Sequence, residues 1–292
     1  MTRSPPLKLA KANLLAGSAS QVTAATTLLR TAAAAGESEA HELLAMLAAA
    51  GIGQPRSSLA ALGHLNRAAE GGSSAARAQL EALADAAGPD PFSSWAAMPN
   101  KRVLNEAPRI VAIDRFLSPN ACRWIIKRSE GRLAPSMVYA SAGPVHSQTR
   151  SNRAFEMSLI DCDVVIILVR LRIAATIGVP VGALETSQVL HYATGQQFAP
   201  HYDYLDPTRT EVRTAGQRVA TFLIYLNDVV QGGETDFPLL NIEHRGASGS
   251  AIYFGNVDPT GEPDPRTLHA GRPPTSGEKW VFSQWVRNRA YV

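Results

Sequence analysis

The chain has few of the features that mark disulfide-rich, membrane-spanning or secreted proteins. Its two cysteines, Cys122 and Cys162, are too few for a disulfide framework and lack C-x-x-C spacing, so we expect two buried thiols. The longest aliphatic run, from Val164 to Val169, is far short of the ~20 apolar residues that cross a bilayer. Lysines interrupt the apolar residues near the amino terminus, which disfavours a secretory signal. We therefore predict a cytoplasmic protein without a membrane span.

Excess charge of one sign is also absent. The 292 residues include 28 Lys and Arg against 25 Asp and Glu, for a formal net charge of +3. No segment shows the dense stripe of Lys and Arg that binding to nucleic acid requires, so we expect no nucleic-acid partner. Hydrophobic residues make up 45% of the chain, which suffices for one large core or two modest ones.

The first third of the chain is rich in Ala and Leu and poor in aromatic residues, which favours helix between residues 10 and 88. A shift of 36 positions aligns this segment with itself, and such a period is typical of helix–turn–helix repeats. The pattern A-A-x-x-G-x-S-x-A resembles Sel1-like repeats, relatives of tetratricopeptide repeats. We predict an all-α helical-repeat domain over residues 1 to 98, with a plain Ala-rich bundle as the alternative. The aligned residues are Leu29, Ala32, Ala33, Gly36, Ser38, Ala40, Leu44 and Leu47 with Leu65, Ala68, Ala69, Gly72, Ser74, Ala76, Leu80 and Leu83.

A Pro- and Gly-containing stretch from Gly88 to Pro108, which we interpret as a linker, precedes a region of short β-rich runs. We expect two helices in this region, one with Ser118 as N-cap that ends near Ser129 and one from Cys162 to Ile177. Clusters of Gly, Pro and Asp separate the expected strands, which favours a barrel or jelly roll over a parallel sheet. The predicted fold class is α+β, with the β-rich domain over residues 99 to 292. The expected strands span residues 110–116, 187–192, 219–226, 249–254 and 279–286.

One short motif places two types of metal ligand close together. His201 and Asp203 are two positions apart, so their side chains lie on one side of an extended strand. His269, 66 residues after Asp203, would complete the 2-His-1-carboxylate face that leaves positions of a non-haem Fe(II) ion open. Lys279 follows ten residues later. A lysine on the inner face of a barrel needs an anionic partner, which the distal carboxylate of 2-oxoglutarate would supply, and Arg272 is the alternative anchor.

Five longer stretches keep a fixed order between positions 189 and 280, within a region of about 180 residues from position 107 to 289. They are V-L-H-Y-A-T-G-Q-Q-F-A-P-H-Y-D, R-V-A-T-F-L-I-Y-L-N, G-G-E-T-D-F-P, G-S-A-I-Y-F-G and L-H-A-G-R-P-P-T-S-G-E-K-W. Together they resemble the prolyl 4-hydroxylase-like branch of the 2-oxoglutarate-dependent dioxygenases. The resemblance implies a double-stranded β-helix, or jelly roll, in which His201, Asp203 and His269 ligate Fe(II). It further implies that Lys279 pairs with the C5 carboxylate of 2-oxoglutarate, that O₂ is the second co-substrate and that ascorbate supports the reaction. The same pocket would be lined by Tyr192, Thr235 and Trp285.

Several of these positions have simpler interpretations. Tyr192 is also compatible with a core tyrosine whose hydroxyl bonds to the backbone, and Thr235 and Trp285 with ordinary strand residues. His191 falls on the opposite face of its strand from Tyr192, so we do not expect it to bind metal. His244 stands in a polar segment, where we expect a solvated side chain.

The substrate side of the pattern is matched less completely. Arg150 and Ser151 match a substrate-side segment and are the candidate substrate-binding residues. Asn152 and Arg153 then stand where smaller residues are common in the family. The polar loop from residue 206 to 217 is expected to flank the mouth of the site as well.

The leading functional hypothesis is hydroxylation of an aliphatic C–H bond, most simply of a prolyl residue in a peptide or protein that the helical repeats help to capture. Asp203 supports hydroxylation, because iron halogenases need that carboxylate position vacant for halide. The alternative is a hydroxylase of a free amino acid or another small molecule, with repeats that only stabilise or dimerise the protein. A catalytically silent interaction protein is disfavoured by the intact ligand set and by Lys279. The sequence leaves the substrate and the oligomeric state open.

Overall fold

The computed structural model describes residues 4–84, 91–96, 99–136, 138–140, 143–145 and 149–290. The chain forms two units. The first comprises Met1–Ala97 with Met157–Ile173, and the second comprises Met98–Glu156 with Ala174–Val292. Residues 88–90, 97 and 98 of the predicted linker lie outside the described residues, and its described part contains α6 (Pro91–Ala96) and β1 (Lys101–Glu106) instead of a plain linker.

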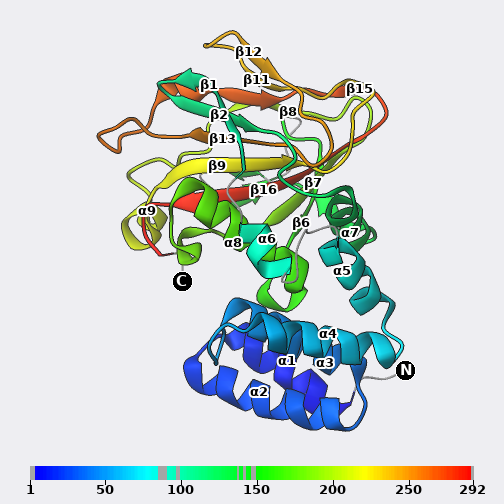
Figure 1. Cartoon of the computed structure of the whole chain (residues 1–292). Helices are drawn as coiled ribbons and strands as arrows, with labels where there is room; N and C mark the ends of the chain where they lie inside the picture. The colour runs from blue at the N-terminus through cyan, green and yellow to red at the C-terminus, as the bar shows by residue number, and fades with distance from the viewer. Residues whose placement is uncertain are drawn as a thin grey trace. The chain divides into compact units, whose positions relative to one another are not determined.

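Successive helices contact one another throughout residues 5–84 of the first unit (Figure 1). Ser18 and Gln21 form a capping box at the start of the second helix, where each side chain meets the other's backbone N–H. The predicted helical character of the first third is therefore confirmed. The helices are α1 (Pro5–Ala16), α2 (Ala19–Ala34), α3 (Ser38–Ala50), α4 (Ser58–Glu70) and α5 (Ser74–Ala84), and the short α6 (Pro91–Ala96) follows.

The repeat in the sequence corresponds to two equivalent turns. Gly36 joins α2 to α3 with φ of +86°, and Gly72 joins α4 to α5 with φ of +91°. Glycine adopts this left-handed conformation without the steric penalty that a Cβ atom brings. Leu29 and Leu65, which the repeat aligns, are both fully buried. The 36-residue shift thus relates two copies of one helix–turn–helix unit, and their assignment as Sel1-like stays a prediction.

A segment from the middle of the chain also belongs to the first unit. It contains the 3-10 helix η1 (Leu159–Asp161) and α8 (Val164–Ile177) as far as Ile173. The backbone N–H of Val164 donates to Oε1 of Gln79 at 3.1 Å, and Arg172 donates to the Trp95 carbonyl at 3.2 Å. The predicted helix is confirmed, but the division at residue 98 assigned this segment to the second domain. Apolar composition identifies a buried helix without showing which core receives it.

Two antiparallel sheets form most of the second unit, and the predicted α+β jelly-roll class is confirmed. The larger sheet has the order β1-β2-β13-β9-β16-β7-β6-β3, and the smaller has the order β12-β11-β14-β8. The larger sheet contains β1 (Lys101–Glu106), β2 (Arg109–Ile113), β3 (Ala134–Pro135), β6 (Arg153–Glu156), β7 (Gln188–Tyr192), β9 (Arg218–Tyr225), β13 (Ala251–Gly255) and β16 (Lys279–Arg287). The smaller contains β8 (Phe198–His201), β11 (Thr235–Phe237), β12 (Ile242–His244) and β14 (His269–Gly271).

Shorter elements join these sheets. They are α7 (Pro119–Ser129), α9 (Thr210–Ala215), the 3-10 helices η2 (Val181–Ala183) and η3 (Pro265–Thr267), and the strand pairs β4 (Val138–Ala140) with β5 (Gly143–Val145) and β10 (Gln231–Gly232) with β15 (Pro274–Ser276). Ser118 caps α7 as predicted, since its hydroxyl accepts a hydrogen bond from the backbone N–H of Ala121 at 3.2 Å.

The core of the second unit draws side chains from both sheets. Phe237 comes from the smaller sheet, and the other members come from the larger one or its ends: Ile110, Leu190, Tyr192, Tyr225, Ile252, Phe254 and Val281. Cys122 and Cys162 are buried thiols, as expected. Within the described ranges, every helix is too short or too polar to span a bilayer.

The contact between Gln79 and α8 gives the first prediction. Gln79→Leu should lower the free energy of unfolding by about 1–3 kcal/mol, because it leaves the buried N–H of Val164 without an acceptor. Urea unfolding followed by circular dichroism measures the change. Glu81→Leu, at an exposed position of the same helix, is the matched control and should have little effect. Equal losses in the two variants would contradict the assignment of residues 157–173 to the helical unit.

Candidate metal centre

Two short antiparallel strands bring the three predicted ligands together. β8 pairs with β14, and in this register His201 lies directly opposite His269. Asp203 follows the end of β8 by two residues. Asp203 and His269, which are 66 positions apart in the sequence, are therefore neighbours in the fold.

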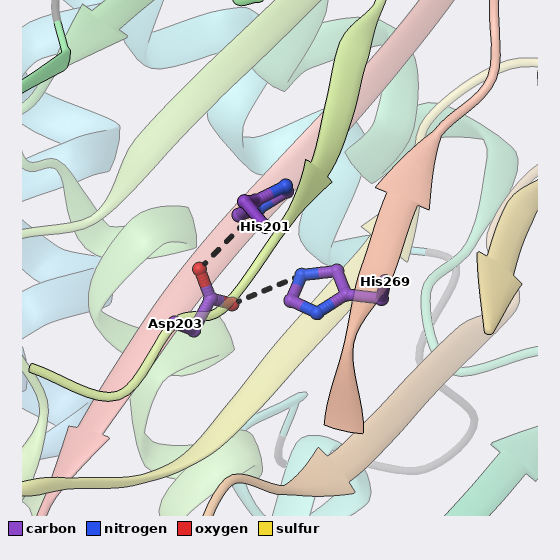
Figure 2. A group of neighbouring side chains, drawn as sticks. All are labelled: His201, Asp203 and His269. Carbon is purple, nitrogen blue, oxygen red and sulfur yellow. Dashed lines mark ion pairs between the residues drawn. The ribbon is translucent and has the colours of Figure 1, made fainter. Parts of the chain in front are cut away.

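The carboxylate of Asp203 lies between the two imidazoles (Figure 2). Its Oδ1 atom is 3.6 Å from Nε2 of His201, and its Oδ2 atom is 3.4 Å from Nε2 of His269. One ligand atom from each residue lies within 4.8 Å of the other two. This spacing suits three ligands on one face of a metal ion.

Backbone carbonyls determine which nitrogen of each imidazole carries the proton. Nδ1 of His201 is 2.8 Å from the carbonyl oxygen of Ala199, and Nδ1 of His269 is 2.9 Å from that of Thr267. A carbonyl oxygen can only accept, so each Nδ1 is the protonated donor. The Nε2 lone pairs of both rings are then available to a metal, in the arrangement common for metal-ligating histidines.

Burial and mutual contacts determine the charges at the centre. Burial, followed by the adjacent His269, lowers the pKa of His201 below its ordinary value. Burial alone would raise the pKa of Asp203, but His269 and His201 together lower it well below the usual range. Near neutral pH the centre offers a neutral imidazole at His201 and a carboxylate. This donor set, with two Nε2 atoms and one carboxylate turned toward one point, fits Fe(II).

An aromatic stack supports the first histidine. The Phe198 ring lies parallel to the imidazole of His201, with 3.4 Å between centroids and 10° between planes. The guanidinium of Arg150 lies 4.5 Å from the centroid of the Phe198 ring. Arg150, Phe198 and His201 all line the cavity at the centre. Arg150 and His201 were predicted from the sequence as site residues. Phe198 was not, although it belongs to the first of the five longer stretches.

Lys279 occupies the same cavity on the side of the larger sheet. It is opposite Tyr192 in the β16–β7 pairing, and only 3% of its surface is exposed. Its ammonium is 5.3 Å from the centroid of the Tyr192 ring and 5.8 Å from that of Tyr225. Burial lowers the pKa of Lys279 to about 8. Within the described part of the chain, no carboxylate forms an ion pair with it, so the cavity offers a cationic site for an anion.

The other residues predicted for the co-substrate pocket also line this cavity. Tyr192, Thr235 and Trp285 all contribute to its wall. Burial raises the pKa of Tyr192 to about 12, which keeps its phenol neutral and able to donate a hydrogen bond. The hydroxyl of Thr235 is 2.9 Å from that of Tyr225, a buried residue that the sequence did not single out.

The two candidate substrate residues differ in their positions. Arg150 lines both the small cavity and a larger adjacent cleft. Ser151 lines neither of them; its hydroxyl accepts from the backbone N–H of Gln197 at 2.9 Å and so ties its segment to the start of β8. Asn152, where the sequence departs from the family pattern, is buried.

Three residues that were weighed as possible site residues do not line the cavity: Arg272, His191 and His244. Arg272 is at the surface, 3.0 Å from Asp236 and 2.8 Å from Glu243, so it does not replace Lys279. His191 faces away from the centre as predicted and lies 2.8 Å from Glu278. The prediction that His244 is solvated is wrong. It belongs to β12, burial lowers its pKa, and its Nε2 atom is shielded from solvent, because pairing with β11 covers a segment that looked like a polar turn.

Thr221 is a functional candidate that the sequence reasoning missed. Its hydroxyl donates to Oδ2 of Asp203 at 2.7 Å. It belongs to β9, where Leu223 and Tyr225 follow at intervals of two, so all three lie on one face. Leu223 lines the cavity and Tyr225 belongs to the core. Alternation within the motif R-V-A-T-F-L-I-Y-L-N could therefore have shown that Thr221 points inward.

Comparisons with known proteins find relatives in sequence and in structure. The 2OG-Fe(II) oxygenase superfamily matches residues 187–287. Prolyl 4-hydroxylase 1 of Arabidopsis thaliana is 34% identical over 204 residues, which covers 64% of this chain and 72% of that protein. Probable prolyl 4-hydroxylase 9 of the same plant is 31% identical over 207 residues, with 64% and 72% covered. The solved viral collagen prolyl hydroxylase of Paramecium Bursaria Chlorella virus-1, in its 2OG complex, is 29% identical with a TM-score of 0.49, and covers 61% of this chain and 95% of that one.

Removal of a ligand should abolish metal binding without unfolding the protein. His201→Ala and Asp203→Ala each leave two ligands, which cannot hold Fe(II) in facial geometry against its modest intrinsic affinity. Anaerobic calorimetry with Fe(II) measures binding, and circular dichroism measures folding. His191→Ala is the matched control, because that histidine contacts Glu278 instead of the centre. Wild-type affinity in either ligand variant would show that the metal binds elsewhere.

Binding of 2-oxoglutarate should weaken as the pH rises through about 8. Below the pKa of Lys279, about 8, the ammonium is already charged and binds the carboxylate directly. Above it, each binding event must also take up a proton, so the dissociation constant should rise by up to tenfold per pH unit. Calorimetry with Fe(II) and without O₂ measures the profile.

Lys279→Ala tests the origin of that profile. It should weaken 2-oxoglutarate binding by about ten- to a hundred-fold, remove the pH dependence and leave Fe(II) affinity nearly unchanged, because the lysine is predicted to contact the co-substrate and not the metal. Arg272→Ala should resemble the wild type. The reverse result would identify Arg272 as the anchor.

Proposed function

The chain belongs to the prolyl 4-hydroxylase family of the 2OG-Fe(II) oxygenase superfamily, and we propose that it hydroxylates prolyl residues within peptides or proteins. It is accordingly a dioxygenase that uses Fe(II), 2-oxoglutarate and O₂, and the enzyme class predicted from the motifs is confirmed. The hypothesis of a catalytically silent interaction protein is not supported. A contribution of ascorbate stays a prediction.

A cleft of about 920 Å³ beside the metal centre carries the proposal of a peptide substrate. It opens onto the small cavity, with which it shares Arg150, Phe198, His201, Asp203 and Trp285. Its volume is near the upper end of the range of about 300–1,000 Å³ that is usual for small-molecule pockets. A free amino acid would fill a small part of it, whereas several residues of an extended peptide would fill it well.

Aromatic side chains form part of the cleft wall, beside charged residues such as Arg132, Glu156 and Arg209. The rings of Tyr202 and Tyr204 stack with 4.7 Å between centroids, and Phe155 and Trp285 line the cleft as well. Proline-containing segments favour the extended polyproline II conformation and dock in aromatic-lined grooves. The wall is therefore suited to a peptide that presents proline to the metal centre.

The proposed roles at the centre follow from the geometry. His201, Asp203 and His269 would hold the iron through two Nε2 atoms and one carboxylate. Lys279 would bind the distal carboxylate of 2-oxoglutarate, and Tyr192 and Thr235 would present hydroxyl groups beside it. Bound iron, with 2-oxoglutarate and O₂, supplies the oxidation that converts a substrate C–H bond to C–OH and yields succinate and CO₂.

Trp285 lies at the junction of the cleft and the cavity, where it would separate substrate from co-substrate. The guanidinium of Arg218 lies 3.5 Å from the centroid of its ring. Glu185 holds that guanidinium at two points, with distances of 2.7 and 2.9 Å. The bidentate pair holds the guanidinium against the indole and so favours one orientation of the ring.

The assay that tests the proposal is succinate release across proline-containing peptides of increasing length, free proline and other amino acids, with mass spectrometry to detect the added oxygen. We expect turnover to rise with peptide length and to be minimal for free amino acids. Tyr202→Ala should raise the KM for the best peptide while leaving the KM for 2-oxoglutarate unchanged, and Leu239→Ala, exposed outside the cleft, is its control. Efficient hydroxylation of free amino acids alone would refute the peptide substrate.

A further inference from the structure

The carboxylate of Asp203 has a third partner besides the two imidazoles. The hydroxyl of Thr221, on β9 of the larger sheet, lies 2.7 Å from its Oδ2 atom. Oδ2 is also the oxygen that faces Nε2 of His269. Both Asp203 and Thr221 are almost completely buried, so this hydrogen bond is made without competition from bulk water.

A second buried side chain continues this contact. Nδ2 of Asn256 lies 3.0 Å from Oγ1 of Thr221, and Asn256 is fully buried. A threonine hydroxyl has one proton, and the carboxylate can only accept, so that proton must point to Asp203. Asn256 must then present its NH₂ group to Thr221. The chain of donors runs in one direction, from the amide through the hydroxyl to the carboxylate.

The backbone fixes the position of Asn256. Its N–H donates to the carbonyl of Val219 at 2.9 Å, and its own carbonyl accepts from Asp264 at 3.1 Å. Its side-chain Oδ1 atom is shielded from solvent and has no hydrogen-bond partner among the residues that the structure describes. A buried amide with one unsatisfied oxygen is destabilising, so stability alone does not account for an asparagine here.

Three separate segments must meet for this arrangement to form. Asp203 follows β8 of the smaller sheet, Thr221 belongs to β9, and Asn256 follows β13, which pairs with β9. In that pairing Thr221 is opposite Phe254, two residues before Asn256. The larger sheet thereby reaches across the core to one oxygen of a ligand carried by the smaller sheet.

We propose that Thr221 and Asn256 are positioning residues that fix the rotation of the Asp203 carboxylate and so determine how it meets the metal. The hydroxyl takes one lone pair of Oδ2 and opposes rotation of the carboxylate about its Cβ–Cγ bond. The amide of Asn256 holds the hydroxyl rotor in that orientation. The proposal rests on the proposed function of the centre as an iron site.

Cobalt(II) provides a probe that reports on the ligands without turnover. Its affinity is measured by calorimetry, and its visible ligand-field bands report the geometry of its ligands. Thr221→Val removes the hydroxyl at nearly constant shape and should lower Co(II) affinity by about ten- to a hundred-fold and alter the bands. Thr221→Ser, which keeps the hydroxyl, should restore both properties. Asn256→Leu should change both in the same direction as Thr221→Val, but by less.

A control separates positioning from a general effect on stability. Thr26→Val makes the same change at a buried threonine of α2 whose hydroxyl bonds only to the carbonyl of Val22 in its own helix. It should leave Co(II) affinity and the ligand-field bands unchanged. Thermal unfolding, followed for every variant, shows the stability cost of each change independently of the metal.

The results distinguish the positioning role of Thr221 and Asn256, here called the relay, from the proposed function of the iron site. Absence of Co(II) binding by the unaltered protein would refute the iron site and the relay with it. Tight binding by the unaltered protein, with the same affinity and bands in folded Thr221→Val, would refute the relay alone. If Thr221→Val does not fold, Asn256→Leu decides, and unchanged affinity and bands in that variant would overturn the proposal.

Discussion

The pairing of β8 with β14 is the constraint on which the site depends. These strands contain four and three residues, and their register places His201 opposite His269. Because side chains alternate across a sheet, a slip of one residue would turn His269 away from Asp203 and dismantle the centre. Neighbours on both sides hold the register: β11 pairs with β14, and Arg150 bridges to Phe198 beside the contact of Ser151 with Gln197. A candidate substrate segment thus also supports the metal centre.

Two buried charges of opposite sign share one cavity without forming a pair with each other. Asp203 receives one hydrogen bond from Thr221 and lies against two imidazoles, which keep it ionised despite its burial. Lys279 is surrounded by aromatic rings, and burial lowers its pKa. A buried charge is costly unless it is paired, so Lys279 favours an anionic ligand, whereas Asp203 together with the two imidazoles favours a cation. A dianionic co-substrate bound between a metal ion and Lys279 satisfies both requirements at once.

Local chemistry in the sequence predicted much of the fold. The Ser118 cap, the glycines at the two repeat turns and the alternating strands each depend on residues within a few positions, and each is present. The centre could be predicted because His201 and Asp203 are two positions apart in one motif, and His269 and Lys279 follow in the order that the family resemblance implies. The unit to which segment 157–173 belongs and the burial of His244 could not be predicted in this way. Their environments depend on partners such as Gln79 and β11 that no local pattern reveals.

The hydrogen bonds that orient the ligands are the least predictable part of the site for the same reason. Thr221 is 18 residues from Asp203 and 35 from Asn256, and only the packing of the two sheets brings the three together. A threonine on a strand and an asparagine at a strand end are ordinary in a sequence. Their roles follow from the direction of two hydrogen bonds. The carboxylate can only accept, so the hydroxyl must donate to it, and the amide must then donate to the hydroxyl. Ligand identity can therefore be inferred from a motif, whereas ligand orientation requires the fold.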